Sequence, residues 1–61
     1  MFISIKDTII NADAVKKIIK QDGTKIGVAY REGSFVLYAF RTVSERDEVF
    51  DQIRTTLLNR K

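Results

Sequence analysis

One segment constrains the fold of this chain more than any other: residues 34–40, SFVLYAF, are apolar at every position from 35 to 40. A strand that buries one face and exposes the other alternates apolar with polar residues. This segment has the β-branched and aromatic residues of a strand but lacks the alternation. Both of its faces therefore need cover, and the rest of the chain must supply it or a partner must.

The chain is too short to cover much apolar surface by itself. Its 61 residues make a single domain, residues 1–61, and a domain of this size buries only roughly 60% of the surface that its unfolded chain exposes. The sequence has no Cys and no His, which excludes disulfides and the commonest zinc sites as sources of stability. We therefore expect either a well-packed core or burial against another subunit.

The loop before this segment predicts how the segment pairs with the preceding strand, residues 25–30. A two-residue type I′ turn would place Glu32 at positive φ, which Glu resists. A three-residue loop, with two right-handed residues followed by Gly33 in the left-handed region, avoids that cost. In the resulting antiparallel hairpin Ala29 faces Phe35.

This register gives the hairpin two apolar faces. The first face comprises Ile26, Val28, Tyr30, Val36, Tyr38 and Phe40. The second face is edged by Lys25 and Arg31 and places small residues beside large ones: Gly27, Ala29, Phe35, Leu37 and Ala39. Small residues leave room for a partner to approach closely, so the second face is the predicted interface.

The N-terminal residues predict two more strands. Residues 2–5 and 8–10 are rich in β-branched and aromatic residues, and the Lys-Asp pair between them suits a tight turn. Asn11 and Asp13 favour a further turn, because their side chains can hydrogen-bond nearby backbone groups.

Residues 14–20, AVKKIIK, fit two structures. Positions 14, 15, 18 and 19 are apolar and match one helical face, with Asn11 or Asp13 as the N-cap. The same residues fit a bulged strand that ends at a turn at Asp22-Gly23. We favour the strand, because that turn would then start a hairpin, and the helix stays open as the alternative.

The C-terminal residues predict an amphipathic helix. Thr42 to Glu45, TVSE, form a capping box in which Thr42 is the N-cap and Glu45 reaches back to it. Apolar residues then recur at three- and four-residue spacing, as in a helix with one buried face: Val43, Val49, Phe50, Ile53 and Leu57.

Several strands followed by one helix indicate an α+β fold. We predict an antiparallel sheet of four or five strands with one C-terminal amphipathic helix packed on one face. The helix covers the first face of the hairpin and leaves Phe35 and Leu37, which point the other way. Two candidates can cover these residues: a second copy of the chain, or the N-terminal strands or a helical 14–20 segment folding over within one chain.

The residue types used in catalysis and metal binding are not arranged for either role. A serine needs an adjacent base to become a nucleophile, and the chain has no His. Asp47 and Asp51, four residues apart, are interpreted as a solvated acidic face near the helix start. The glycines are not clustered ahead of a helix, as a phosphate-binding loop requires. We predict no catalytic residue, no metal, no cofactor and no enzymatic activity.

The basic residues suggest nucleic acid as an alternative ligand. A basic sheet with exposed aromatic residues binds single strands by stacking bases and neutralising phosphates. Phe35 and Tyr30 would supply the aromatic rings. The other interpretation is that these lysines only prevent edge-to-edge aggregation of the sheet. The candidate contacts lie on adjacent segments: Lys16, Lys17, Lys20, Lys25 and Arg31.

The sequence predicts no association with membranes. No apolar run approaches the roughly 18 residues of a membrane-spanning helix. The N-terminus lacks the basic start and long apolar core of a signal peptide. Together with the absence of Cys, this predicts a cytoplasmic protein.

Three segments of the sequence together resemble a group of proteins: TIINADAVKKI, DGTKI and FRTVSERDEVFDQI. They are similar to short bacterial and phage β-rich proteins with a single C-terminal helix, many of which have no assigned activity. In these proteins an I-N-x-D turn, a D-G hairpin and an F-x-[S/T]-x-x-E helix start recur. The resemblance implies the fold.

The leading prediction is a non-enzymatic assembly or adaptor domain that acts through protein–protein contacts, as a homodimer or with another protein. The second apolar face of the sheet is the observation behind it. The alternative is a protein that binds single-stranded nucleic acid through its basic, aromatic-bearing sheet.

Overall fold

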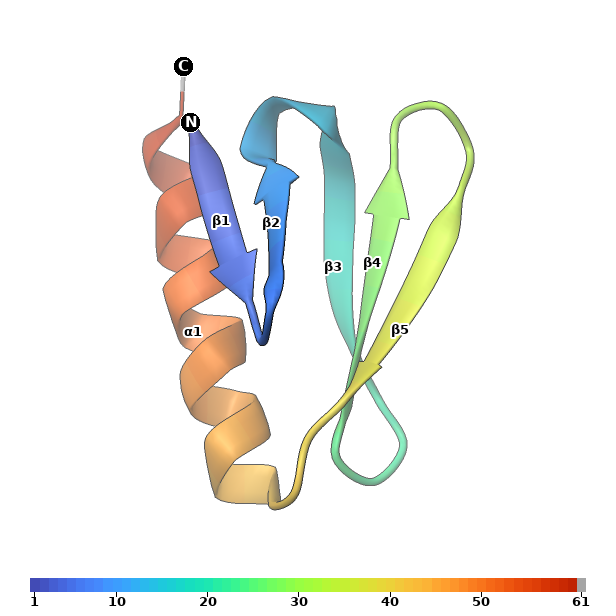
Figure 1. Ribbon diagram of the computed structural model, residues 1–61, viewed down its shortest axis with the longest axis vertical. Helices are drawn as coiled ribbons and strands as arrows, with labels where there is room; N and C mark the ends of the chain where they lie inside the picture. The colour runs from blue at the N-terminus through green and yellow to red at the C-terminus, as the bar shows by residue number, and fades with distance from the viewer. Residues whose placement is uncertain (61) are drawn as a thin grey trace.

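The computed structural model describes residues 1–60 and has an α+β fold, as predicted (Figure 1). Five strands and one 3₁₀ turn precede a single C-terminal helix. In chain order the elements are β1 (Phe2–Ile5), β2 (Thr8–Asn11), η1 (Ala12–Ala14), β3 (Val15–Gln21), β4 (Lys25–Tyr30), β5 (Phe35–Ala39) and α1 (Val43–Asn59).

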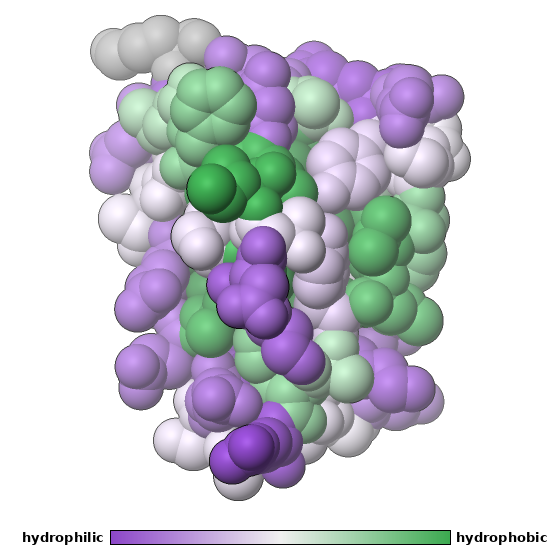
Figure 2. Space-filling view, viewed as in Figure 1, coloured by the Kyte–Doolittle hydropathy of each residue, from purple (hydrophilic) through white to green (hydrophobic). Residues whose placement is uncertain are grey.

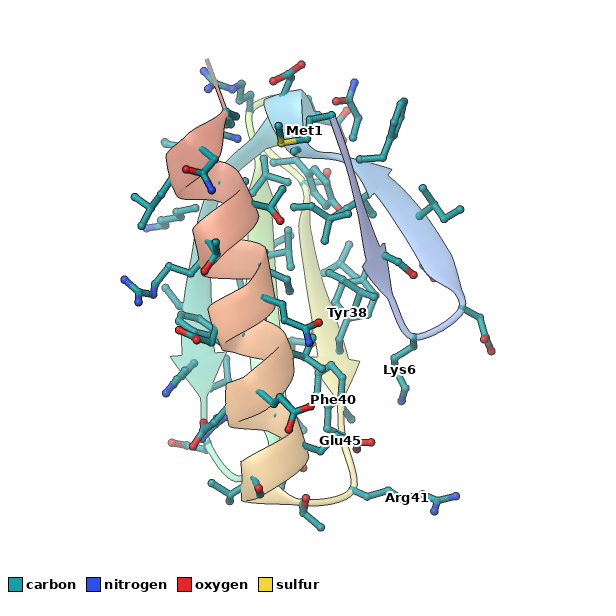
Figure 3. The ribbon with its side chains drawn as sticks, turned by 90° about the vertical axis from the view of Figure 1, so that its left-hand side faces the viewer. Met1, Lys6, Tyr38, Phe40, Arg41 and Glu45 are labelled. Atoms are coloured by element: carbon teal, nitrogen blue, oxygen red, sulfur yellow. The ribbon has the colours of Figure 1, made fainter. Side chains whose placement is uncertain are left out.

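The strands form two antiparallel sheets, so the prediction of one sheet of four or five strands was wrong. One sheet is the hairpin β1–β2, and the other has the order β3–β4–β5. The break lies at η1, where the Asn11 side chain accepts a hydrogen bond of 3.0 Å from the Asp13 N–H. Because this turn redirects the chain between β2 and β3, the hairpin becomes a separate layer. It lies on the same side of the three-stranded sheet as α1 (Figure 3).

The ambiguous segment 14–20 is a bulged strand from Val15 onward, as favoured from the sequence, while Ala14 ends η1. The register of β3 against β4 shifts between Val15 and Lys17, and from there the pairing is regular to Gln21 opposite Lys25. A β-bulge adds one residue to one strand and increases the local twist. The Asp22-Gly23-Thr24 turn closes this hairpin, with Gly23 at φ +72°.

The register predicted for β4 and β5 is confirmed. Ala29 pairs with Phe35, and the pairing continues to Lys25 opposite Ala39. Gly33 has a φ of +109°, and its N–H donates to the Tyr30 carbonyl over 3.0 Å. The loop chemistry therefore determined which side chains of β5 share a face.

The helix begins at its predicted cap. The Thr42 Oγ1 atom accepts a hydrogen bond of 3.0 Å from the Glu45 N–H, whereas the Glu45 carboxylate reaches one residue further than predicted, to the Arg41 N–H at 3.1 Å. The predicted apolar stripe packs against the core except at its start, where Val43 is 51% exposed. Arg46 occupies the inward-facing position at this end of the helix.

The core lies between the two sheets and the helix. Ile26 and Val28 on β4 are fully buried, and Ile53 on α1 is 1% exposed. The remaining buried apolar residues come mainly from the hairpin and the start of β3: Ile3, Ile5, Ile10, Ala12 and Val15. The hairpin and the helix thus share the first face of the three-stranded sheet.

Candidate interaction surface

The face of the three-stranded sheet that points away from α1 collects all five predicted interface residues. We call it the open face. The pairing of β3, β4 and β5 also places three β3 side chains and Lys25 on it. The open face comprises Lys17, Ile19, Gln21, Lys25, Gly27, Ala29, Phe35, Leu37 and Ala39.

The larger apolar side chains of the open face are exposed. Phe35 is 48% and Leu37 is 52% exposed, and Figure 2 shows an apolar patch on the right, over the position of β5 in Figure 1. The N-terminal strands do not fold over this face, because Ile3 and Ile5 are buried in the core on the other side of the sheet. Within residues 1–60, therefore, no segment covers the open face.

Gly27 leaves room for the Phe35 ring on the open face. A Cβ atom at this position would lie 2.5 Å from Cζ of Phe35 and 3.1 Å from Cγ1 of Ile19. Real Cβ atoms do not approach so closely, so a side chain here would displace the Phe35 ring. The glycine in the middle of β4 is thus explained by close packing beside a large neighbour.

The outer side of the β1–β2 hairpin carries a second exposed apolar patch, which was not predicted from the sequence. Phe2 is 70% and Ile9 is 72% exposed. The register pairs Phe2 with Asn11 and Ser4 with Ile9, so polar residues separate the two apolar ones across the hairpin. This patch is therefore more interrupted than the apolar centre of the open face.

The basic residues proposed to contact nucleic acid do not share one surface. Lys17 and Lys25 lie on the open face, whereas Lys20 pairs with Ile26 and points toward the helix. There Lys20 Nζ lies 3.2 Å from the Asp47 carboxylate and 5.1 Å from the centre of the Phe50 ring.

The remaining two candidates, Lys16 and Arg31, are exposed beyond the regular part of the face. Lys16 sits in the bulge of β3, where the register shifts. Arg31 donates from Nε to the Asp13 carbonyl over 2.9 Å. The guanidinium therefore holds the 3₁₀ turn against the β4–β5 loop.

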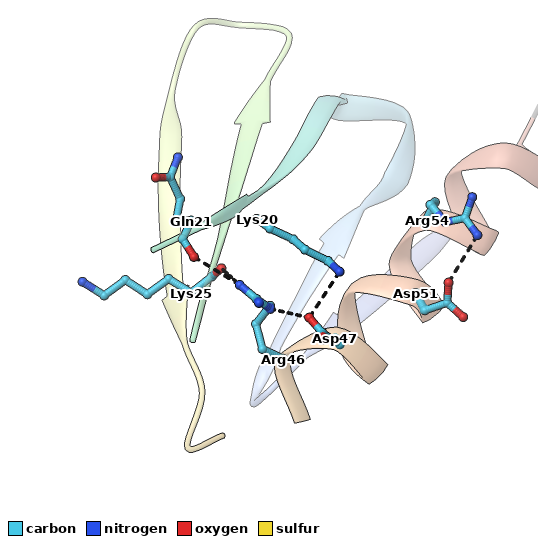
Figure 4. A network of polar contacts seen from close by, with 7 residues as sticks. All are labelled: Lys20, Gln21, Lys25, Arg46, Asp47, Asp51 and Arg54. Carbon is cyan, nitrogen blue, oxygen red and sulfur yellow. Dashed lines mark hydrogen bonds and ion pairs between the residues drawn. The ribbon is translucent and has the colours of Figure 1, made fainter. Parts of the chain in front are cut away.

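Two arginines have structural roles that were not predicted from the sequence. Arg46 is 8% exposed, and its Nη1 atom donates to the carbonyls of Gln21 at 3.1 Å and Lys25 at 3.2 Å (Figure 4). Arg60 donates to the carbonyls of Ala12 and Val15. Each side chain ties one end of the helix to one end of β3, which no periodicity in the sequence indicates.

The charges around Arg46 stabilise one carboxylate. Hydrogen bonds from Arg46, at 2.7 Å, and from Lys20 lower the pKa of the Asp47 carboxyl group below its usual range. An opposite charge at hydrogen-bond distance favours the ionised form. Arg46, Asp47 and Lys20 thus form a bridge between the helix start and the β3–β4 hairpin.

Tyr30 lies on the core side of the sheet and has the most strongly shifted pKa among the residues described. Burial raises the pKa of the Tyr30 hydroxyl to about 12, and the neighbouring Tyr38 hydroxyl adds to this shift. Because the folded state holds this proton more tightly than the unfolded state, its contribution to stability is complete below pH 10 and is lost as the pH rises toward 12.

We expect tyrosinate absorbance in a pH titration of the folded protein to contain a component with a midpoint near 12. This component should disappear in the Tyr30→Phe variant and persist in Tyr38→Phe with a lower midpoint, since Tyr38 contributes to the shift. If the titration of Tyr30→Phe matched that of the wild type at high pH, Tyr30 would not occupy the desolvated position described.

Comparison of the chain with protein-family models, with curated proteins and with solved structures found no match. The resemblance to short β-rich bacterial and phage proteins therefore stays a prediction. Within residues 1–60 the structure shows no pocket and no group of three or more potential metal ligands. The single helix of this described part is not long and apolar enough to cross a membrane.

Proposed function

We propose that this protein is a small, non-enzymatic assembly domain that forms a homodimer by packing the open faces of two copies against each other. The observation that carries the proposal is the exposure of Phe35 and Leu37 on a sheet face that nothing else in the described chain covers. A cytoplasmic location is part of the proposal and agrees with a sequence that contains no Cys.

The composition of the open face supports a second copy as the occupant. Its centre has no charge, and the small residues Ala29 and Ala39 pair with or follow the large Phe35 and Leu37, so that large side chains of one copy can fit over small ones of the other. The space over Gly27 is already filled by the Phe35 ring of the same chain. Burying an apolar side chain of this size contributes roughly 1.5–3 kcal/mol before the costs of association. Two sheets can pack face to face at a distance of about 10 Å.

The size of the chain supports the same conclusion. Only eight apolar residues are buried in the described core, and short domains without disulfides or metals commonly gain stability by forming oligomers. A contiguous exposed apolar patch on a small soluble domain usually marks an interaction site. Dimer formation would therefore add to the stability of each copy.

The double variant Phe35→Ser, Leu37→Lys tests this proposal by sedimentation equilibrium. We expect the wild type to sediment as a dimer whose thermal stability rises with protein concentration. The double variant should sediment as a monomer and its stability should no longer depend on concentration. The matched control, Phe2→Ser with Ile9→Lys, removes the two exposed apolar side chains on the outer side of the hairpin and should stay dimeric.

Two results of this experiment would reject a dimer formed through the open faces. One is a wild type that remains monomeric at millimolar concentration. The other is a double variant that stays dimeric while the control variant becomes monomeric, which would move the interface to the hairpin. If the double variant loses its helical circular dichroism, Leu37→Ser alone takes its place, because this change adds no charge. The same two results would then reject the dimer through the open faces.

A second candidate function is the binding of single-stranded nucleic acid on the open face. It is favoured by two lysines on the same face as the exposed Phe35 ring: Lys17 is in the same row as Phe35, across Ala29, and Lys25 pairs with Ala39 at the other end of β5. Lysine side chains would neutralise phosphates while the ring stacks on a base.

Changing Lys16, Lys17 and Lys25 together to Gln tests the second candidate. We expect a labelled oligonucleotide to bind more weakly. The slope of the logarithm of the binding constant against the logarithm of the salt concentration should become less steep by about 0.7 for each phosphate that is no longer neutralised. Lys20→Gln is the matched control, because Lys20 lies on the other face and pairs with Asp47. Absence of binding by the wild type at low salt would exclude this function.

A further inference from the structure

The two edges of the three-stranded sheet differ in their chemistry. The edge strand β3 carries three lysines and a bulge, features that keep edge strands from pairing with other chains. The opposite edge strand, β5, has the sequence FVLYA, with no charge, no proline and no register shift. Phe35, Val36 and Leu37 are all more than a third exposed, so this edge is accessible from both faces.

The backbone of β5 has donors and acceptors that point away from the sheet. The Tyr30 N–H donates to the Ser34 carbonyl at 2.9 Å, and the Phe40 N–H donates to the Thr24 carbonyl at 3.0 Å. Hydrogen bonding in an antiparallel ladder alternates from residue to residue. The backbone N–H and C=O groups of the even-numbered residues of this segment therefore bond to β4, and those of residues 35, 37 and 39 point away from the sheet. In agreement with this, the Ala39 carbonyl accepts a hydrogen bond of 2.6 Å from Lys6 Nζ.

The ends of the other edge are already bonded. Arg60 donates to the Val15 carbonyl at 2.9 Å, and Arg46 donates to the Gln21 carbonyl at 3.1 Å, at the two ends of β3. No strand of the described chain pairs with the outer edge of β5, which is the last strand of its sheet. The structure therefore leaves one edge that is both apolar and without a neighbouring strand.

Positive charge collects at one end of β5. Lys6 bonds to the Ala39 carbonyl, Lys25 is in register with Ala39, and Arg41 follows closely along the chain. Figure 3 shows Lys6 and Arg41 at the same end of the strand. Three positive side chains thus stand against the nearby negative side chain of Glu45, which accepts a hydrogen bond from the Arg41 N–H. An acidic side chain of an incoming segment would meet complementary charge here.

We propose that the β5 edge binds an extended segment of a partner protein, which adds to the sheet as a fourth strand antiparallel to β5. The segment is rich in β-branched residues and uncharged apart from an acidic residue beside Ala39. Backbone hydrogen bonds to Phe35 and Leu37 and to the N–H of Ala39, whose carbonyl is already bonded to Lys6, supply the affinity, and the side chains on both faces supply the selectivity. This binding goes beyond the proposed dimer, because packing two open faces leaves the edge of β5 accessible.

The test uses the synthetic peptide Glu-Glu-Val-Thr-Val-Thr-Val-Glu-Glu with N-methyl groups on alternate residues, which leaves one edge able to bond and prevents the peptide from aggregating. Nuclear magnetic resonance of the ¹⁵N-labelled full chain should show shifts and slowed hydrogen exchange at the amides of Phe35, Leu37 and Ala39. The fully N-methylated peptide should leave these amides unchanged. A peptide flanked by Lys in place of Glu should bind about two- to fivefold more weakly.

A variant of the protein tests the same edge with the peptide left unchanged. In Leu37→Pro the outward N–H is removed while the hydrogen bonds of β5 to β4 are kept, and proline is tolerated on an edge strand. Peptide affinity should fall at least tenfold. If this variant does not fold, the comparison of the partly and fully N-methylated peptides on the wild-type protein decides whether the β5 edge binds the segment.

The outcomes for the edge and for the dimer are separable. Equal binding of the partly and fully N-methylated peptides, or shifts confined to β3, would overturn the proposal for β5. If the protein is a dimer and its β5 amides do not change on addition of the peptide, the proposal for β5 is likewise overturned while the proposed function stands. A monomer whose Phe35, Leu37 and Ala39 amides are protected by the peptide would support it while rejecting the dimer.

Discussion

Replacing Ile53 with Ala should lower the free energy of unfolding by about 2–5 kcal/mol, as for other large-to-small changes in protein cores. Ile53 is 1% exposed and packs with the fully buried Ile26 and Val28 of β4. The change removes buried methyl groups and leaves a cavity that the surrounding residues fill only in part. Since small domains are marginally stable, a loss of this size unfolds much of the population.

Thermal and urea unfolding of Ile53→Ala check this expectation, with Leu58→Ala as the matched control. Leu58 is on the same helix but is 71% exposed, so its replacement should change stability by no more than about 0.5 kcal/mol. Equal losses from the two changes, or an unchanged midpoint for Ile53→Ala, would show that the helix does not face the core in the way described.

The second large effect is expected from Arg46→Met, which should lower the free energy of unfolding by about 1.5–3 kcal/mol. Methionine keeps the apolar stem of the side chain but removes the charged donor from the carbonyls of Gln21 and Lys25. Carbonyls that lose a charged donor at a partly buried site retain most of their desolvation cost. The pKa of Asp47 should also rise, since Arg46 is the main cause of its depression.

Arg54→Met is the control for this change. Arg54 is exposed and, among the residues that the structure describes, pairs with Asp51 alone, on the same helix and over 3.3 Å. Exposed pairs of this kind contribute at most about 1 kcal/mol. If Arg46→Met proved as stable as the wild type, an apolar residue would serve equally well at this position, as occurs for some buried ion pairs. The bridge between the helix and the hairpin would then not stabilise the fold.

Local chemistry made much of this fold predictable from the sequence. Gly33 had to accept positive φ, which determined the β4–β5 register and therefore the side of the sheet on which Phe35 lies. Thr42 had to begin the helix, because its hydroxyl satisfies a backbone N–H that has no partner within the helix. Each of these features depends on residues only a few positions apart.

The division into two sheets was not predictable in the same way. The hydrophobic pattern of residues 2–5 and 8–10 is equally compatible with a strand pair joined to a larger sheet and with one packed as a separate layer. What decides between them is the 3₁₀ turn at residues 12–14 and the burial of Ala12, which depend on contacts across the whole molecule. Long-range packing therefore overrode an expectation based on strand number.

The candidate site was predictable in part. Its five apolar members follow from the period-two alternation of a strand once the register is known. The division of the basic residues between the two faces was not predicted. Lys17 and Lys20 are three residues apart in the regularly paired part of β3, so alternation alone places them on opposite faces and brings Lys20 beside Asp47. The position of Lys16, by contrast, depends on the bulge between Val15 and Lys17.

Whether the open face joins two copies of the chain can be decided by an isotope-filtered nuclear magnetic resonance experiment. Protein labelled with ¹³C at the leucine methyl groups is mixed with unlabelled protein, and nuclear Overhauser effects between the two are recorded. We expect effects from the Leu37 methyl groups to aromatic protons of the unlabelled copy, and none from the Leu58 methyl groups. Intermolecular effects from Leu58 alone, or none from Leu37 at millimolar concentration, would contradict the proposed dimer.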